Sequence, residues 1–262
     1  MKFYEFGNIN NPVILLLPGT CCHWKNNYDH VLDLLAESFY VVCVSYDGFD
    51  ETEQTEFNDM ITETEKIEGY IKNKFNGKVH AVYGCSLGGS FVGLLIQRKQ
   101  IHMEHGILGS SDLDQEDKWK AKMQTKIFVP IVYHIIHKGK INRLTAWYMK
   151  KRVDEQYLKG FMHIMLGVEG QKLEFVTKRS MENQFYSDLI TKMEDGIDVN
   201  GTSVHCLYAS KMGEMYLKRY KQHFKNPHIV KHDLKHEELL ACRPNEWVEV
   251  IKKCIILCLK GR

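Results

Sequence analysis

The sequence predicts an α/β protein with a doubly wound, mostly parallel sheet and a helical cap insertion. Short apolar runs alternate with amphipathic helical patterns at the start of the chain, and the alternation resumes after Asn200-Gly201. Alternation of this kind indicates parallel strands with right-handed crossovers. Between residues 113 and 190 the pattern is helical only. We therefore expect a core of residues 1–112 and 191–262, with the insertion at 113–190, which suits a chain of 262 residues.

The first part of the chain shows the alternation most clearly. Val13–Leu17 is a continuous apolar run, as expected for a strand that helices cover on both faces. Residues 28–37 carry an apolar stripe at helical spacing. The expected elements are strands at Lys2–Phe6, 13–17, 39–45, 79–83 and 106–109, and helices at 28–37, 55–75 and 90–96.

The insertion and the end of the chain complete the predicted fold. Apolar helical faces occur at 128–136, 144–148 and 157–166, so this segment is either a cap over the strand ends or a plain second helical layer. The elements expected after it are a strand at 203–208, a helix at 214–224, a strand at 228–230, a loop at 231–240 and a helix at 245–259.

Composition excludes several classes of protein. The net charge is +2 without a basic patch, so nucleic acid is not an expected partner. The N-terminus has no signal-peptide pattern, and no apolar run is long enough to span a bilayer. The eight cysteines lack ligand spacing and fit buried reduced thiols. These features predict a cytoplasmic protein.

Residues 78–96 hold the main functional motif. An apolar strand leads into Gly84-Cys85-Ser86-Leu87-Gly88, and an apolar helix follows. Strand, G-x-S-x-G and helix form the context of a nucleophile elbow, in which the glycines let the strand and helix cross closely and the serine hydroxyl is exposed. The alternative is a glycine-rich turn whose serine caps the helix.

A serine nucleophile needs a base and an oxyanion site. Histidine is the usual base, and His236 lies between the last predicted strand and the last helix, with His232 as its rival. The backbone N–H groups of Leu87 and Thr20 are the expected oxyanion donors. Thr20 follows Pro18-Gly19 at a strand end, which by itself also fits an ordinary turn.

The order of these motifs resembles the α/β-hydrolase superfamily along essentially the whole chain. The resemblance rests on Leu-Leu-Leu-Pro-Gly-Thr20, Trp24, Gly-Cys-Ser86-Leu-Gly-Gly and His236-Glu-Glu-Leu. It implies Ser86 as nucleophile, His236 as base, and Thr20 with Leu87 as the oxyanion hole. The superfamily usually has histidine before the glycine of the first motif, where this chain has Pro18.

The superfamily also implies an acid that orients the histidine. Its usual place, after the strand ending at Tyr208, reads Ala209-Ser-Lys-Met212 and holds no carboxylate. Asp112, after the preceding strand, is the expected acid, and Glu214 is the alternative. Asp112 also fits a helix N-cap, and Glu214 fits a first-turn carboxylate that complements a helix dipole.

The resulting prediction is a serine hydrolase that acts on a small or medium ester, or a thioester, through an acyl-enzyme. This chemistry needs no metal or organic cofactor. The competing interpretation is a non-catalytic binding or regulatory protein on the same fold, which the empty acid position favours.

Overall fold

Seven strands form one sheet in the order β1-β3-β2-β4-β5-β6-β7. The structure is a computed structural model that describes residues 1–139, 154–167 and 172–256. β1 pairs antiparallel with β3, and all the other neighbouring strands pair in parallel. The prediction of a mostly parallel sheet is therefore confirmed. The strands are β1 (Lys2–Phe6), β2 (Val13–Leu17), β3 (Tyr40–Ser45), β4 (Lys78–Cys85), β5 (His102–Gly109), β6 (Ser203–Ala209) and β7 (His228–His232).

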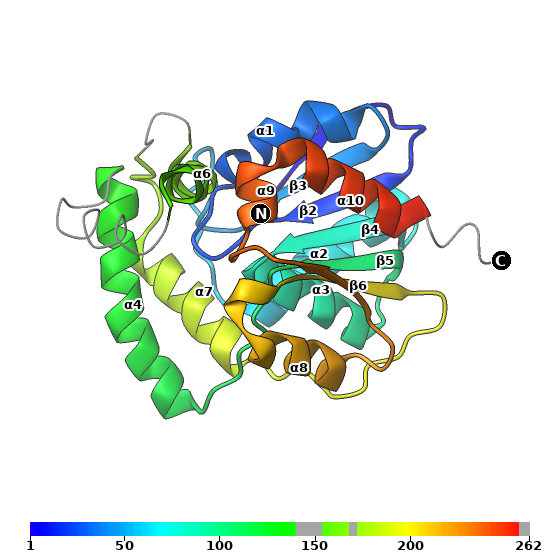
Figure 1. The fold of residues 1–262 in the computed structure, drawn as a ribbon. Coiled ribbons are helices and arrows are strands. Elements are labelled where there is room, and N and C mark those ends of the chain that lie inside the picture. Colours follow the sequence, from blue (N-terminus) through cyan, green and yellow to red (C-terminus); the bar gives the residue numbers. More distant parts are fainter. Residues whose placement is uncertain (140–153, 168–171, 257–262) are drawn as a thin grey trace.

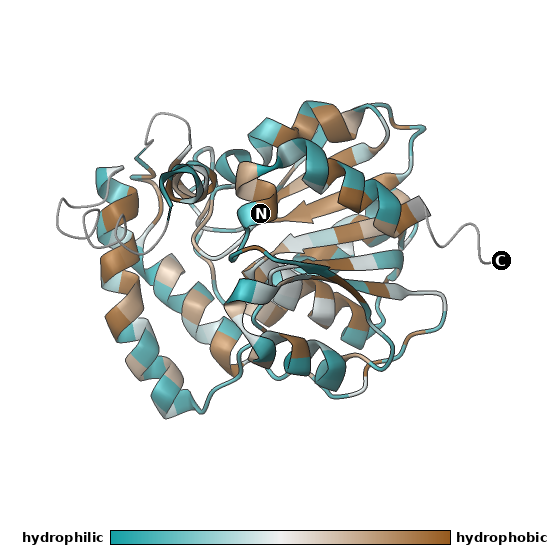
Figure 2. Ribbon diagram, in the orientation of Figure 1, coloured by the Kyte–Doolittle hydropathy of each residue, from teal (hydrophilic) through white to brown (hydrophobic). Residues whose placement is uncertain are grey.

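Helices cover both faces of the sheet (Figure 1). α1 (Trp24–Ala36), α9 (Glu238–Cys242) and α10 (Pro244–Ile256) pack on one face. α2 (Met60–Phe75), α3 (Leu87–Arg98) and α8 (Glu214–His223) pack on the other. Each face has its own cluster of buried apolar side chains, and Figure 2 shows hydrophobic residues concentrated along the strands. Burial on both faces explains why Val13–Leu17 reads as an unbroken apolar run.

A helical segment stands between β5 and β6. It contains α4 (Lys118–Lys138), α6 (Glu155–Leu166) and α7 (Lys178–Ile190). Figure 1 places these helices beside the carboxyl ends of the strands, where open α/β sheets hold their sites. The segment predicted at 113–190 is thus helical in its described part, although α4 begins only at Lys118. The apolar face predicted at 144–148 lies outside the described residues.

Some boundaries differ from those expected from the sequence. α1 begins at Trp24 rather than Tyr28, and α2 begins at Met60 because the Asp59 side chain accepts a hydrogen bond from the N–H of Thr62. The expected 231–240 loop contains the start of α9, so that expectation was wrong there. Its Leu239 and Leu240 are buried, which explains why this short helix forms.

The remaining predictions concern cysteines and membranes. Seven cysteines lie in the described part of the chain, and six of them are buried. Within that same part, no helix has the length and apolar character needed to cross a bilayer.

Candidate active site

Ser86 stands at the turn between β4 and α3 with φ 50° and ψ −112°. A non-glycine residue in this region is strained, and such strain persists only where the surroundings over-determine it. The surroundings here are crowded. A Cβ on Gly84 would lie 2.0 Å from the carbonyl of Gly88, and one on Gly88 would lie 2.2 Å from the carbonyl oxygen of Leu17. The turn therefore requires both glycines of the motif.

Three hydrogen bonds to two segments hold the turn in place. The N–H of Ser86 donates to the carbonyl of Gly109, at the end of β5, over 2.8 Å. The Ser111 hydroxyl donates to the Ser86 carbonyl over 2.7 Å. The same N–H of Ser86 also reaches the carboxylate of Glu237. The loop after β7 is thus brought against the turn at Ser86.

His236 is half-buried near the end of β5. Burial lowers the pKa of His236 to about 4, and a hydrogen bond from the ring to the backbone carbonyl of Ser110 acts in the opposite direction. The ring is therefore neutral at neutral pH. Phe161 of α6 lies edge-on to it, with 6.4 Å between the ring centroids. Among the described residues, no hydrogen bond joins the ring to the Ser86 hydroxyl.

Glu237, the next residue, is a buried carboxyl beneath the turn. Its Oε1 lies 3.0 Å from the nitrogen of Ser86, and the Tyr83 hydroxyl lies 3.4 Å from Oε2. Burial raises the pKa of Glu237 to about 8, although the hydrogen bonds from Ser86, Cys85 and Tyr83 act to lower it. The backbone of Glu237 has φ 53°, and its N–H donates to the Ser110 hydroxyl.

The backbone N–H groups expected to form the oxyanion hole lie in two different turns. The N–H of Gly19 donates to Asn27 Oδ1, and the N–H of Cys21 donates to Gln184 Oε1 of α7. Between them, the N–H of Thr20 has no acceptor in the part of the chain that the structure describes. Leu87 is the first residue of α3, so its N–H lacks an acceptor within the helix. Neither N–H group has an acceptor within the residues that the structure describes.

Asp112 lies in the loop after β5, and its carbonyl accepts a hydrogen bond from Arg219 over 2.9 Å. Burial raises the pKa of Asp112, while the charge of Arg219 opposes this. Burial and the neighbouring Asp112 also raise the pKa of Asp188 on α7. Within the described residues, no hydrogen bond or ion pair joins the carboxylate of Asp112 to the ring of His236.

The alternative acid, Glu214, and the alternative base, His232, lie in different environments. Glu214 is exposed at the first turn of α8, where a carboxylate complements the helix dipole. His232 ends β7, and its Nε2 is buried without a hydrogen-bond partner. Burial lowers the pKa of His232, with Glu246 of α10 opposing this. His232 therefore faces the α10 side, together with Trp247 in a small cavity.

Comparison with known proteins finds matches to the structure but none to the sequence. No protein-family model matches the sequence, and no curated protein matches it either. Solved structures match over nearly the whole length. An alpha/beta hydrolase family protein from Desulfitobacterium hafniense has a TM-score of 0.77 at 15% identity, with 98% of this chain and 100% of that chain covered. The chain has the α/β-hydrolase fold.

Other proteins with this fold are similar at the same level. A lipase-esterase related protein from Clostridium acetobutylicum has a TM-score of 0.67 at 15% identity, covering 96% of this chain and 98% of that one. The type II thioesterase BorB from the borrelidin biosynthetic cluster has a TM-score of 0.68 at 13% identity, with 97% of each chain covered. At these identities the similarity establishes the α/β-hydrolase fold alone.

Sequence reasoning missed Glu237, Ser110 and Gln184 at this site of the α/β-hydrolase fold. Glu237 follows the expected base directly, but a carboxylate is rarely buried, so its position beneath Ser86 could not be inferred. Gln184 is fully buried and comes from a helix remote in sequence. The only signal for Glu237 was its place beside His236.

Proposed function

We propose that the chain is a serine hydrolase that cleaves a small or medium carboxylic ester, or a thioester, through an acyl-enzyme on Ser86. The observation that supports this most is the backbone of Ser86, held at φ 50° between β4 and α3. Strain of this kind clusters at functional sites. The loop that carries His236 is bound to the same turn through Glu237.

The proposed reaction follows from these groups. The Ser86 hydroxyl attacks the substrate carbonyl while His236, neutral because burial lowers its pKa to about 4, accepts the proton. The N–H groups of Thr20 and Leu87 bind the oxyanion. The imidazolium returns the proton to the leaving alcohol or thiol, which departs as the acyl-enzyme forms. Water then attacks that ester, and the free acid leaves.

The acid of this site is proposed to be Asp112. It lies two residues after Ser110, whose carbonyl accepts the hydrogen bond from the His236 ring. A carboxylate from the same loop would orient the ring and stabilise the imidazolium. Glu214, which is exposed on α8, is the alternative.

The helical segment between β5 and β6 is proposed to act as a cap and shape the substrate pocket. Gln184 of α7 binds the N–H of Cys21, next to the proposed oxyanion donor Thr20. The stacked rings of Phe128 and Phe185 belong to the same segment. The apolar side chains of this segment are the reason for proposing an apolar acyl or alcohol part in the substrate. The lipase-esterase related protein and the thioesterase with the same fold support this range of substrates.

One observation favours a second candidate, a non-catalytic binding protein on the same fold. In the described part of the chain, no hydrogen bond links Ser86 to the His236 ring, and the ring's partner is a carbonyl rather than a carboxylate. Catalytic hydrogen bonds are often long before substrate binds, so this geometry is compatible with both candidates.

Labelling with a fluorophosphonate probe tests the proposal. The wild-type chain should become labelled, Ser86→Ala should not, and His236→Ala should react far more slowly. His232→Ala is the matched control and should label as the wild type does. The same proteins should then be assayed on p-nitrophenyl esters of increasing acyl length. A folded wild-type chain that stays unlabelled would establish the binding protein instead.

A further inference from the structure

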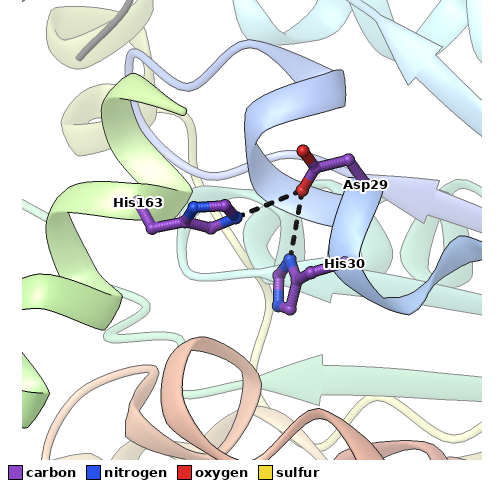
Figure 3. Close-up of side chains that lie close together, drawn as sticks. All are labelled: Asp29, His30 and His163. Carbon is purple, nitrogen blue, oxygen red and sulfur yellow. Dashed lines mark hydrogen bonds and ion pairs between the residues drawn. The ribbon is translucent and has the colours of Figure 1, made fainter. Parts of the chain in front are cut away.

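Two helices bring together, outside the candidate active site, three side chains of types that can bind a metal ion. Asp29 and His30 lie on α1, and His163 lies on α6 (Figure 3). The Oδ1 atom of Asp29 lies 3.4 Å from Nδ1 of His30 and 3.2 Å from Nε2 of His163. All three side chains are partly exposed, so an ion from solvent can reach them.

The hydrogen bond on the far side of His30 fixes its tautomer. Nε2 lies 2.9 Å from the carbonyl oxygen of Leu240. Because a carbonyl only accepts, Nε2 must carry the proton. In the neutral ring, Nδ1 then presents a lone pair to the carboxylate of Asp29. Two acceptors face each other stably only when a cation lies between them, either a proton on the ring or a metal ion.

The three side chains supply one carboxylate oxygen and two imidazole nitrogens, which are ligand types that divalent transition metals bind.

The spacing of these atoms fits a tetrahedral ion. Ligand atoms about 2.0–2.1 Å from a tetrahedral Zn²⁺ lie roughly 3.3 Å apart. The two distances from Asp29 Oδ1, 3.2 Å and 3.4 Å, agree with that edge. The three ligand atoms all lie within 4.8 Å of one another. Small side-chain rotations therefore suffice to surround one ion.

We propose that Asp29, His30 and His163 bind one divalent transition-metal ion, with Zn²⁺ as the best fit. Imidazole and carboxylate ligands suit this class of metal, and hard ions such as Mg²⁺ prefer oxygen ligands only. The hydrogen bond from His30 to the Leu240 carbonyl is the outer contact that orients a metal-binding histidine. With three protein ligands, the fourth position remains for water or a small ligand.

An ion at this site would link two different parts of the fold. α1 belongs to the core that covers the sheet, whereas α6 belongs to the helical segment between β5 and β6. A bound ion would tie these two parts together. His30 and His163 also line an open cavity of 670 Å³ with Leu158, Met162 and Pro244, so a small ligand has access to the fourth position.

Metal retention tests the site directly. A chain without an affinity tag should be loaded with excess ZnCl₂, dialysed without chelator, and analysed for zinc by mass spectrometry. We expect one equivalent in the wild type and almost none in Asp29→Asn or His163→Ala. His134→Ala, which removes an exposed histidine of α4, is the matched control and should retain the full equivalent. Circular dichroism establishes that each variant is folded.

Two further measurements distinguish a metal from a proton. Co²⁺ should give the intense visible absorption of a tetrahedral site in the wild type and in His134→Ala, but not in His163→Ala. Zn²⁺ should raise the Tm of the wild type and leave the Tm of His163→Ala unchanged. If the wild type retains no more zinc than His163→Ala, the cluster is a protonated His30–Asp29 pair and the proposal is wrong. None of these readouts depends on activity at Ser86, so each proposal can fail alone.

Discussion

The backbone N–H of Ser86 points at the carboxyl of Glu237, with 3.0 Å between the nitrogen and Oε1. The contact joins residues 151 positions apart and places a fully buried ionisable group directly beneath the proposed nucleophile. Burial raises the pKa of Glu237 to about 8, so the group is mostly protonated at neutral pH. A neutral carboxyl keeps negative charge away from the site where an oxyanion would form.

Glu237 should make stability depend on pH. The unfolded chain loses this proton near 4.5, whereas the native chain keeps it to about 8. Between those pH values, unfolding releases a proton from Glu237. The stability that Glu237 contributes is therefore fully present below about pH 4.5 and is lost as pH rises towards 8. Each pKa unit is worth about 1.4 kcal/mol, so the total decline should amount to a few kcal/mol.

Glu237→Gln removes this titration with little change of shape. Urea unfolding of wild type and variant from pH 5 to 9 should show a wild-type advantage that shrinks with pH and levels off above about 8. Glu238→Gln makes the same chemical change on the next, partly exposed side chain and serves as control. The difference in free energy of unfolding between wild type and Glu237→Gln could instead be independent of pH, or depend on pH equally for the control. Either result would contradict the raised pKa of Glu237.

The strained turn gives a second prediction. Ser86 has φ 50° and ψ −112°, which glycine adopts without steric cost and other residues do not. Strain of this kind costs about 1–3 kcal/mol. Ser86→Gly should therefore have a free energy of unfolding roughly 1 kcal/mol higher than that of Ser86→Ala, after the extra freedom of glycine in the unfolded chain is subtracted. Urea unfolding of both variants measures this difference.

The comparison with alanine isolates the backbone effect, because both variants lack the hydroxyl. Both should also fail to react with the fluorophosphonate probe. Equal stabilities for the two variants would mean that the backbone relaxes at residue 86 and that no strain is stored there.

The sheet could be read from the sequence because burial on both faces leaves a local signature. β1 and β2 have the predicted bounds, since apolar runs mark strands covered by helices. The start of α1 could not be read. Asn26 and Asn27 are polar yet buried, and the Asn27 side chain accepts the N–H of Gly19. A helix prediction based on the spacing of apolar residues misses a buried polar residue, because its burial depends on a partner distant in sequence.

The candidate site shows the same division. The strand, turn and helix around Ser86 were predictable because the glycines and flanking elements are adjacent in sequence. The partners of the His236 loop come from separate segments, and the ring's contact with the Ser110 carbonyl leaves no mark on residue types, since every residue has a carbonyl. The identity of the acid therefore stays a prediction, with Asp112 and Glu214 as candidates.

Substitution of each carboxylate distinguishes them. If Asp112 stabilises the imidazolium of His236, Asp112→Asn should lower kcat by roughly 10⁴-fold while the protein stays folded. Glu214→Gln should leave kcat unchanged and lower stability by about 0.3–1 kcal/mol, since Glu214 lies at the first turn of α8. Kinetics on the best p-nitrophenyl ester and urea unfolding of both variants provide the two readouts. The reverse pattern would assign the acid to Glu214. Unchanged kcat in both variants would mean that the Ser110 carbonyl orients His236 without a carboxylate, because that carbonyl is the ring's present hydrogen-bond acceptor.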